Sequence, residues 1–197
     1  MTKSVPLFYF GNIAYWSELI KLEKLCFTPH FPIPKKTYAN RTVILMANGL
    51  QTLTVPIVGG RGSKIPMDQI EISYLENWIA KHKMALQSAY AKSSYYEHYM
   101  PYFEPIWAAK PHTLMQLNLN IFKMLSKVLK LHVEIVEEEN TNLSEVQFIP
   151  NIYSQTVVSY PQVFRYKFPF HPDLSILDLL FCLGPDAKSY LEKGHSK

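Results

Sequence analysis

The chain alternates short apolar runs with longer segments of helical periodicity, a pattern that predicts an α/β fold. Residues 5–10 are apolar and end at Gly11-Asn12, and a second apolar run covers residues 25–28. Runs of this length are typical of buried strands. The segment between them, residues 12–24, has a helical period. Strand, short helix and strand in this order predict a βαβ unit with parallel strands.

A β-hairpin is the clearest local prediction. Two β-rich stretches, RTVILMA and LQTLTVPIV, flank Asn48-Gly49. Both of these residues accept the positive φ angles that a tight turn requires. Further strands are expected at residues 69–74, at residues 132–138 and, with a weaker signal, at residues 162–168.

Helical patterns dominate from residue 78 onward. The first helix is expected to run from Trp78 to about Tyr90. Capping boxes predict the starts of the next two helices, Ser94 with Glu97 and Thr113 with Gln116. Two prolines are expected to shorten or kink the second helix. A last helix over residues 175–185 is stopped by a glycine and a proline, with a further turn after it.

Together these elements predict one α/β (or α+β) domain over residues 1–197. We expect a mixed sheet of about five to six strands that includes the hairpin and is covered by helices. Hydrophobic residues at 48% and charged residues at 18% are typical of a globular protein. The formal charge of +4 suits an anionic small molecule, and the basic residues are too dispersed to indicate nucleic-acid binding.

Cysteine usage and the absence of targeting signals predict a cytoplasmic protein. Cys26 and Cys182 are far apart and lie inside apolar runs, which favours buried thiols over a disulfide. The N-terminus lacks the pattern of a signal peptide. No segment approaches the roughly 18–20 apolar residues that span a bilayer, so no membrane span is expected.

The stretch WIAKHKMALQSAYAKSSYYEHY, residues 78–99, is the richest in candidate site residues. It concentrates side chains with an apolar body and a polar tip, which suit a semi-polar pocket wall. His82 could act as a general base, with Gln87 or Tyr90 orienting a substrate. The alternative is a core histidine bonded to a backbone carbonyl. The tyrosines could stack on a sugar ring or simply pack between helices.

A polar cluster precedes the hairpin and consists of Lys36, Tyr38, Asn40 and Arg41. The planar guanidinium of Arg41 suits a phosphate or a carboxylate, and Lys36 adds a mobile positive charge. The alternative is a solvated junction between loop and strand. Asn12 follows the first expected strand, where α/β sheets bind ligands, although it can equally cap the helix behind it.

Several motifs are absent or weak. The glycine-rich GGRGSK at residues 59–64 lacks the spacing of a phosphate-binding loop and is expected to be flexible, although a mobile lid is an alternative. No metal-ligand spacing, nucleophile elbow or dinucleotide-binding loop occurs, so a bound metal or a nicotinamide cofactor is not supported. The need for another cofactor stays open.

The order of short motifs along the chain resembles the WbqC-like family of bacterial proteins. The similarity rests on YFGNIAYW, KTYANRTVI, the Asn-Gly turn into LTVPI, WIAKHKMALQSAY with SSYYEHY, LMQLNLNIFKML, and LSILDLLFCLGPDAKSYL. The resemblance implies a role in O-antigen (lipopolysaccharide) synthesis, and a glycine- or acyl-type transferase activity. It carries over no catalytic residue.

Two functions follow as expectations. The first is a transferase that acts on a small anionic or sugar-nucleotide substrate in surface-polysaccharide biosynthesis. The second is a non-catalytic binding or scaffold protein that uses the tyrosine-rich helices as a partner surface, because aromatic residues are enriched at interface hot spots. The oligomeric state is left open by the sequence.

Overall fold

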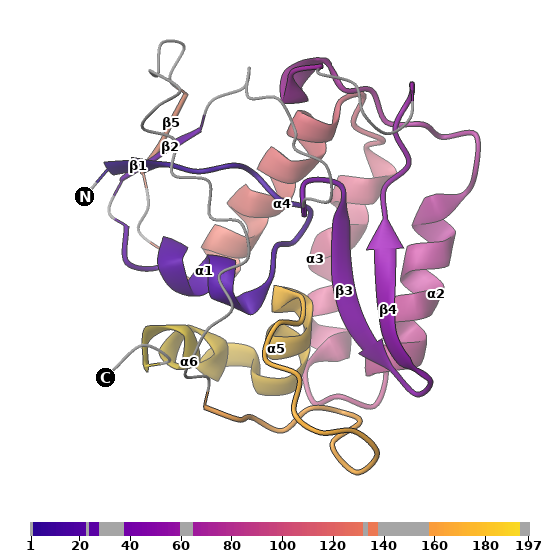
Figure 1. The fold of residues 1–197 in the computed structure, drawn as a ribbon, viewed down its shortest axis with the longest axis vertical. Coiled ribbons are helices and arrows are strands. Elements are labelled where there is room, and N and C mark those ends of the chain that lie inside the picture. Colours follow the sequence, from indigo (N-terminus) through magenta and orange to yellow (C-terminus); the bar gives the residue numbers. More distant parts are fainter. Residues whose placement is uncertain are drawn as a thin grey trace.

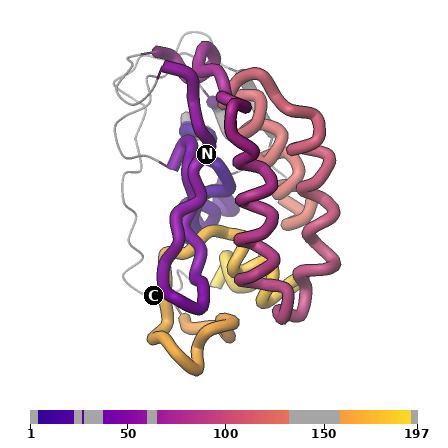
Figure 2. Tube along the Cα trace, turned by 90° about the vertical axis from the view of Figure 1, so that its right-hand side faces the viewer, coloured from indigo at the N-terminus to yellow at the C-terminus, as the bar shows by residue number. Residues whose placement is uncertain are grey.

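The computed structural model describes residues 2–22, 24–27, 38–59, 65–131, 134–137 and 158–193. Its principal helices are α2 (Trp78–Tyr90), α3 (Tyr96–Ala108) and α4 (Leu114–Val128). In Figure 1 these three helices run side by side, and Figure 2 shows the hairpin as a second layer against them. The shorter helices are α1 (Ile13–Leu19), α5 (Ile176–Leu183), α6 (Ala187–Lys193) and the 3₁₀ turns η1 (Met67–Gln69) and η2 (Gly184–Asp186).

The described strands belong to two separate sheets. Strands β1 (Thr2–Ser4), β2 (Lys24–Phe27) and β5 (Glu134–Glu137) form a parallel sheet in the order β1-β2-β5. Strands β3 (Arg41–Met46) and β4 (Gly49–Thr54) form an antiparallel hairpin of their own. The predicted single mixed sheet of five to six strands is therefore wrong, although helices and strands are mixed along the chain as expected.

Two segments that were expected to be strands explain much of this error. Residues 5–10 are largely buried, but they form no strand ladder. Their backbone groups bond elsewhere, for example Tyr9 N to Tyr38 O at 3.0 Å and Phe10 O to Trp16 Nε1 at 2.6 Å. Residues 69–74 contain the end of η1 and isolated bridges instead of a strand. For residues 5–10 the apolar pattern predicted burial correctly. It did not predict whether the segment pairs with a strand, because strand hydrogen bonds also need a neighbouring strand.

The βαβ prediction is right in topology, with its first strand displaced. Strands β1 and β2 are parallel, with Thr2 opposite Lys24, and α1 lies between them in the chain. The first strand occupies residues 2–4 and not 5–10. The connection from β1 into α1 is therefore an irregular segment that is largely buried in the core. Within it, the Phe10 ring packs on Phe103 at 5.3 Å and Trp107 at 6.1 Å.

The hairpin is present, but its turn is shifted by one residue. Met46 lies opposite Gly49, so Ala47 and Asn48 form the turn. Gly49 has φ 116°, whereas Asn48 is not among the described non-glycine residues with positive φ. Gly49 alone therefore supplies the conformation for which glycine is favoured.

Local helix signals succeeded in part. Helix α2 has the predicted bounds, and Thr113 with Gln116 forms the predicted capping box of α4. The box predicted for α3 is wrong, because that helix begins at Tyr96 with no side-chain cap. Both prolines lie inside α3 without ending it. Residues 162–168 form turns and not the weak strand predicted there.

Candidate functional site

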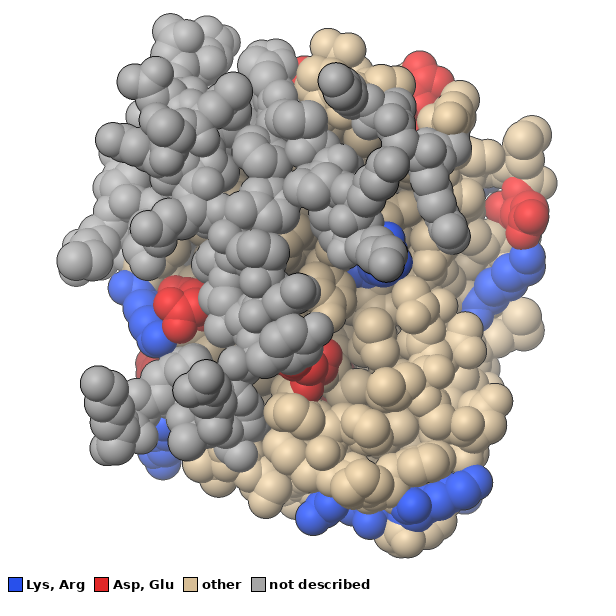
Figure 3. Space-filling model, viewed as in Figure 1, with Lys and Arg blue, Asp and Glu red and all other residues tan. Residues whose placement is uncertain are grey.

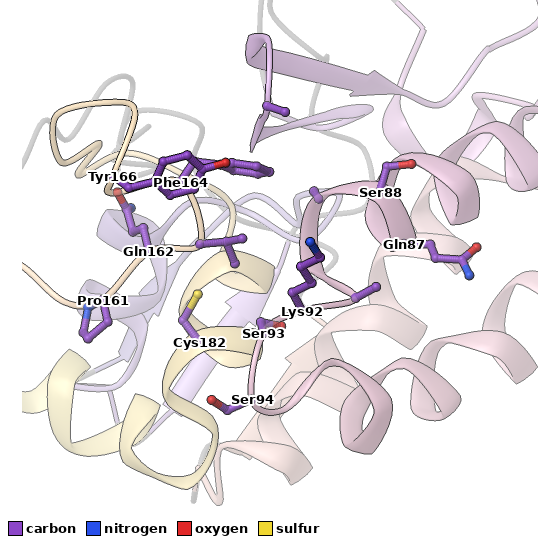
Figure 4. A pocket seen from close by; sticks show the side chains of 14 residues that line it. Gln87, Ser88, Lys92, Ser93, Ser94, Pro161, Gln162, Phe164, Tyr166 and Cys182 are labelled. Carbon is purple, nitrogen blue, oxygen red and sulfur yellow. The ribbon is translucent and has the colours of Figure 1, made fainter.

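A cavity of about 840 Å³ lies where the end of α2 approaches the segment before α5. One wall comes from residues 87–94, at the end of α2 and in the turn that follows, and the facing wall comes from residues 161–166. Ala47 of the hairpin turn and Cys182 of α5 complete the lining (Figure 4). Small-molecule sites typically enclose about 300–1,000 Å³, so the cavity has a suitable size.

The lining combines one cation with polar and aromatic groups. Lys92 is exposed and makes no ion pair with another described residue. In Figure 4 its ammonium group points toward the space below Phe164 and Tyr166. Tyr166 is 81% exposed and Phe164 is buried, with 6.3 Å between their ring centroids. This arrangement offers a positive charge and an aromatic surface to one ligand.

Positive charge gathers at this end of the molecule. On the face shown in Figure 3, described Lys and Arg side chains collect along the lower edge. Figure 1 places the hairpin turn and the segment before α5 at the same edge. That segment contributes Arg165, which is exposed, and Lys167, whose ammonium donates to Ala47 O at 2.5 Å. The local field therefore favours an anionic ligand.

Cys182 is a free, partly buried cysteine on the cavity wall. Burial raises the pKa of its thiol, the nearby Asp178 carboxyl raises it further, and a hydrogen bond with the Val163 backbone opposes them. The thiol therefore stays protonated near neutral pH. Because the thiolate is the nucleophilic form, Cys182 is better suited to lining the cavity than to attacking a substrate.

His82, the predicted general base, lies on the buried side of α2. Its side chain is only 4% exposed, and its Nδ1 lies 2.9 Å from the Tyr9 hydroxyl. Burial lowers the pKa of His82 to about 4, and a hydrogen bond with the Thr54 backbone partly opposes this shift. The ring is neutral near neutral pH, as a base must be, but it is covered. The arrangement is that of the core histidine considered as the alternative, and the catalytic role stays a prediction.

The structure describes three of the four residues in the polar cluster before the hairpin, since Lys36 lies outside the described residues. Tyr38 O accepts the backbone bond from Tyr9. Asn40 closes the base of the hairpin, because its side chain donates to Val55 O at 2.9 Å. Arg41 is partly buried, and its Nε has no hydrogen-bond partner in the described part of the chain. This Nε is itself buried and so is not open to a ligand, while Tyr38 and Asn40 have structural partners.

Asn12 acts as the cap of α1. Its Oδ1 accepts from Tyr15 N at 3.0 Å, and its Nδ2 lies 3.3 Å from Asp173 Oδ1. Its side chain is 7% exposed, and its backbone forms an isolated bridge with Ser175. The residue thus ties the N-terminal segment to the start of α5. A role in substrate binding stays a prediction.

Of the predicted substrate-orienting residues on α2, Gln87 lines the cavity and Tyr90 does not. Figure 4 shows the Gln87 amide pointing away from the other labelled side chains. Tyr90 is fully buried, with its ring 5.2 Å from that of Phe181. The neighbouring Tyr96 also packs on Phe181, and the Tyr95 ring lies over Gly184. These tyrosines join α2 and α3 to α5, in agreement with the packing alternative.

The comparisons with known proteins decide the family. The model of the WbqC-like protein family matches residues 8–155. The chain belongs to the WbqC-like family. It is similar to the uncharacterised protein Rv1507c of Mycobacterium tuberculosis, with 26% identity over 93% of this chain and 91% of the relative. No solved structure matches the chain significantly.

The two walls of the cavity differ in their relation to the WbqC-like family. Residues 87–94 lie inside the range of the family match, whereas residues 161–166 and Cys182 lie beyond it. The similarity to the mycobacterial relative covers 93% of the chain and so extends beyond the range of the family match. The candidate site therefore joins the matched region to the C-terminal part of this WbqC-like protein.

Sequence reasoning missed the principal residues of this cavity. Lys92, Ser93 and Ser94 form a polar run directly after α2, and such a run at a helix end is a usable signal. Gln162 and Tyr166 gave no usable signal, because nothing in the local sequence predicts that they approach α2. Their contribution depends on a contact between segments far apart in the chain.

Two further observations concern the described residues. No group of three or more His, Cys, Asp and Glu side chains among them could hold a metal ion. A search of the same residues finds no helix with both the length and the apolar character needed to cross a membrane.

Proposed function

We propose that this WbqC-like protein is a cytoplasmic transferase that binds a small anionic or sugar-nucleotide substrate in the cavity at the end of α2. The observation that carries the proposal is a cavity of about 840 Å³ whose lining includes Phe164, Tyr166 and Lys92, and the Lys92 ammonium forms no ion pair with another described residue. An ammonium group suits a phosphate or a carboxylate. An aromatic face suits a nucleobase or the C–H face of a sugar.

The biological context of the proposal comes from the family. The resemblance implies a glycine- or acyl-type transfer in O-antigen or other surface-polysaccharide synthesis, and we propose the same context for this chain. In this proposal the cavity binds the charged part of the substrate. Three serines of the lining, Ser88, Ser93 and Ser94, supply hydroxyl groups for the polar remainder.

The residues first predicted from the sequence differ in how readily they could contact a ligand in the cavity. Gln87 lines the cavity and can contact a ligand only after a change of rotamer, because its amide points away. Arg41 stays a second anion-binding candidate on the hairpin as a partly exposed cation, although its unpaired Nε is buried. His82 can serve as a base only if its covering side chains move, because its ring is 4% exposed.

The proposal is tested by calorimetric titration and thermal-shift measurements with UDP-glucose, UMP and acetyl-CoA. Specific binding raises the melting temperature by mass action. Lys92→Ala is expected to weaken binding of the preferred anion about tenfold, equivalent to about 1.4 kcal/mol. The matched control is Lys123→Ala, which removes an exposed lysine from α4. Equal affinity in the two variants would reject the cavity as the anion site.

A non-catalytic binding or scaffold role is the second candidate, and one observation favours it. On α3, Tyr102 is 47% exposed and lies 6.1 Å from the exposed His98 ring. Exposed aromatic pairs of this kind are common in interface hot spots. Loss of a partner interaction in Tyr102→Ala, with unchanged ligand binding in the cavity, would favour this role over the first.

A further inference from the structure

Residues 162–171 form a loop that one side chain closes at its base. The Gln162 amide accepts from His171 N at 3.0 Å through Oε1 and donates to His171 O at 2.8 Å through Nε2. In an antiparallel sheet, two directly opposite residues exchange one N–H···O bond in each direction. The Gln162 side chain makes the same two bonds with the backbone of His171. Because Gln162 is only 5% exposed, this closure lies inside the molecule.

Three buried polar side chains, Gln162, Tyr160 and Asp178, are linked by hydrogen bonds at the base of this loop. Gln162 Nε2 lies 3.2 Å from the Tyr160 hydroxyl, and this hydroxyl donates to Asp178 Oδ1 at 2.6 Å. Tyr160 is 4% exposed and Asp178 is 1% exposed. In the described part of the chain, Asp178 forms no ion pair. The hydrogen bonds among Gln162, Tyr160 and Asp178 therefore offset the cost of burying the Asp178 carboxyl group.

The loop carries one wall of the cavity and is held at a second point. Phe164 and Tyr166 lie within it and line the cavity. Lys167, beside them, donates to Ala47 O in the hairpin turn. The loop is thus held at its base by the hydrogen bonds among Gln162, Tyr160 and Asp178, and near its tip by the contact between Lys167 and the hairpin. Loss of the buried hydrogen bonds would release the base of the loop.

We propose that Gln162, Tyr160 and Asp178 are positioning residues of the cavity, which hold the loop 162–171 so that Phe164 and Tyr166 face a bound ligand. The part of this inference that concerns the ligand rests on the proposed function. The part that concerns the loop stands without it. None of the three residues is proposed to touch the reacting atoms.

The ionisation of Asp178 should make the order of the loop depend on pH, which packing alone would not do. Burial raises the pKa of Asp178 to about 6, and the hydrogen bond from the Tyr160 hydroxyl opposes the shift. The titratable groups that face the carboxyl are Tyr160 before the loop, Tyr90 from α2 and Cys182 from α5. The described parts of β3, α1, α3 and α6 also pack on α5 or beside it, but contribute no charged group to the shift. Because burial outweighs the hydrogen bond from Tyr160, ionisation of Asp178 favours opening of the buried network.

The test measures hydrogen–deuterium exchange of the amides of residues 163–170 in the full chain. Tyr160→Phe and Gln162→Met are expected to lower the protection factor of this segment at least about tenfold, while α4 keeps its protection. Tyr102→Phe and Gln69→Met are matched controls at exposed positions and should change neither. Unchanged protection of residues 163–170 in both test variants would overturn the inference.

The pH profile separates positioning by the buried carboxyl from simple packing. In the wild-type chain the protection factor of residues 163–170 is expected to fall between pH 5 and about pH 7, because ionisation of the buried Asp178 carboxyl favours the opened loop, in which the carboxylate reaches water. In Asp178→Asn the profile should be flat, and a wild-type slope in this variant would remove Asp178 from the network. The affinity for UDP-glucose should follow the protection factor. If exchange responds as expected but the wild type binds none of the probes, the proposed function fails while the loop assignment holds.

Discussion

The Tyr9 hydroxyl and the His82 ring form a buried hydrogen bond, with 2.9 Å between the oxygen and Nδ1. Because a tyrosine hydroxyl donates readily, the bond assigns Nδ1 as the acceptor and leaves the ring proton on Nε2. The pair joins the buried N-terminal segment to α2, and the Trp78 ring lies 5.1 Å from the histidine. His82 therefore connects the buried N-terminal segment to α2 within the core.

Removal of this hydrogen bond is expected to destabilise the protein. Tyr9→Phe leaves a buried ring nitrogen without its donor, which costs about 1–3 kcal/mol. Urea unfolding monitored by circular dichroism measures the change. Tyr102→Phe, at an exposed position, is the control and should unfold like the wild type. A stability equal to the wild type in Tyr9→Phe, combined with lost activity, would instead favour the catalytic role of His82.

Acid should destabilise the fold through His82. Its pKa is lowered from 6.5 to about 4 in the folded state, so the unfolded chain binds the proton more tightly. The contribution is fully present above pH 6.5 and is lost as the pH falls toward 4, with a limit of about 3 kcal/mol. The measurement compares the free energy of unfolding at pH 7.5 and 4.5 in the wild type and in His82→Gln. The fall should be smaller in the variant, and an identical fall would contradict the assignment.

Asp178 should act on stability in the opposite direction. Its pKa is raised from 3.8 to about 6 in the folded state, so the folded chain binds the proton more tightly. Stability from this group is lost as the pH rises from about 3.8 through 6, and above that the loss approaches about 3 kcal/mol. Relative to the wild type, Asp178→Asn should therefore be more stable at pH 7.5 than at pH 4.5. A constant difference between the two proteins over this range would contradict the raised pKa.

Gly184 is predicted to be the least replaceable described glycine. It has φ 56°, and an added Cβ would lie 2.5 Å from the Tyr95 ring. Gly184→Ala combines backbone strain with overlap and is expected to cost about 3 kcal/mol or more. Gly59→Ala is the matched control, because φ is 81° there but nothing lies within 4 Å of the added atom. Thermal unfolding of both variants measures the difference, and equal losses would show that the overlap is relieved.

Local features of the sequence were sufficient for α2 and for the start of α4, but not for the start of α3 or for the sheets. The bounds of α2 and the capping box at Thr113 follow from residues within a few positions of each other. Residues 5–10 were misassigned, because their apolar character is shared by a strand and by a buried segment whose carbonyls accept from side chains and whose Tyr9 amide donates to a distant loop. The division into two sheets depends on which strands meet, and that information lies outside each segment.

The site was predicted only where one segment contains it. Gln87, predicted from a semi-polar stretch, is among the lining residues of the cavity, and its role in substrate binding stays a prediction. Tyr90 belongs to the same stretch, yet its side chain packs on Phe181 and is fully buried. The facing wall comes from residues 161–166, far away in sequence, and its position depends on the loop closure by Gln162. Such a contact between distant segments cannot be deduced from hydrophobic periodicity.

The most direct test of the central claim is a crystal structure of the chain grown with saturating UDP-glucose. The account predicts density for the ligand in the cavity between residues 87–94 and 161–166. A phosphate should lie beside the Lys92 ammonium, and an aromatic or sugar ring should lie against Tyr166. Ligand density at Arg41 with an empty cavity, or no ligand density at a concentration that raises the melting temperature, would contradict the account.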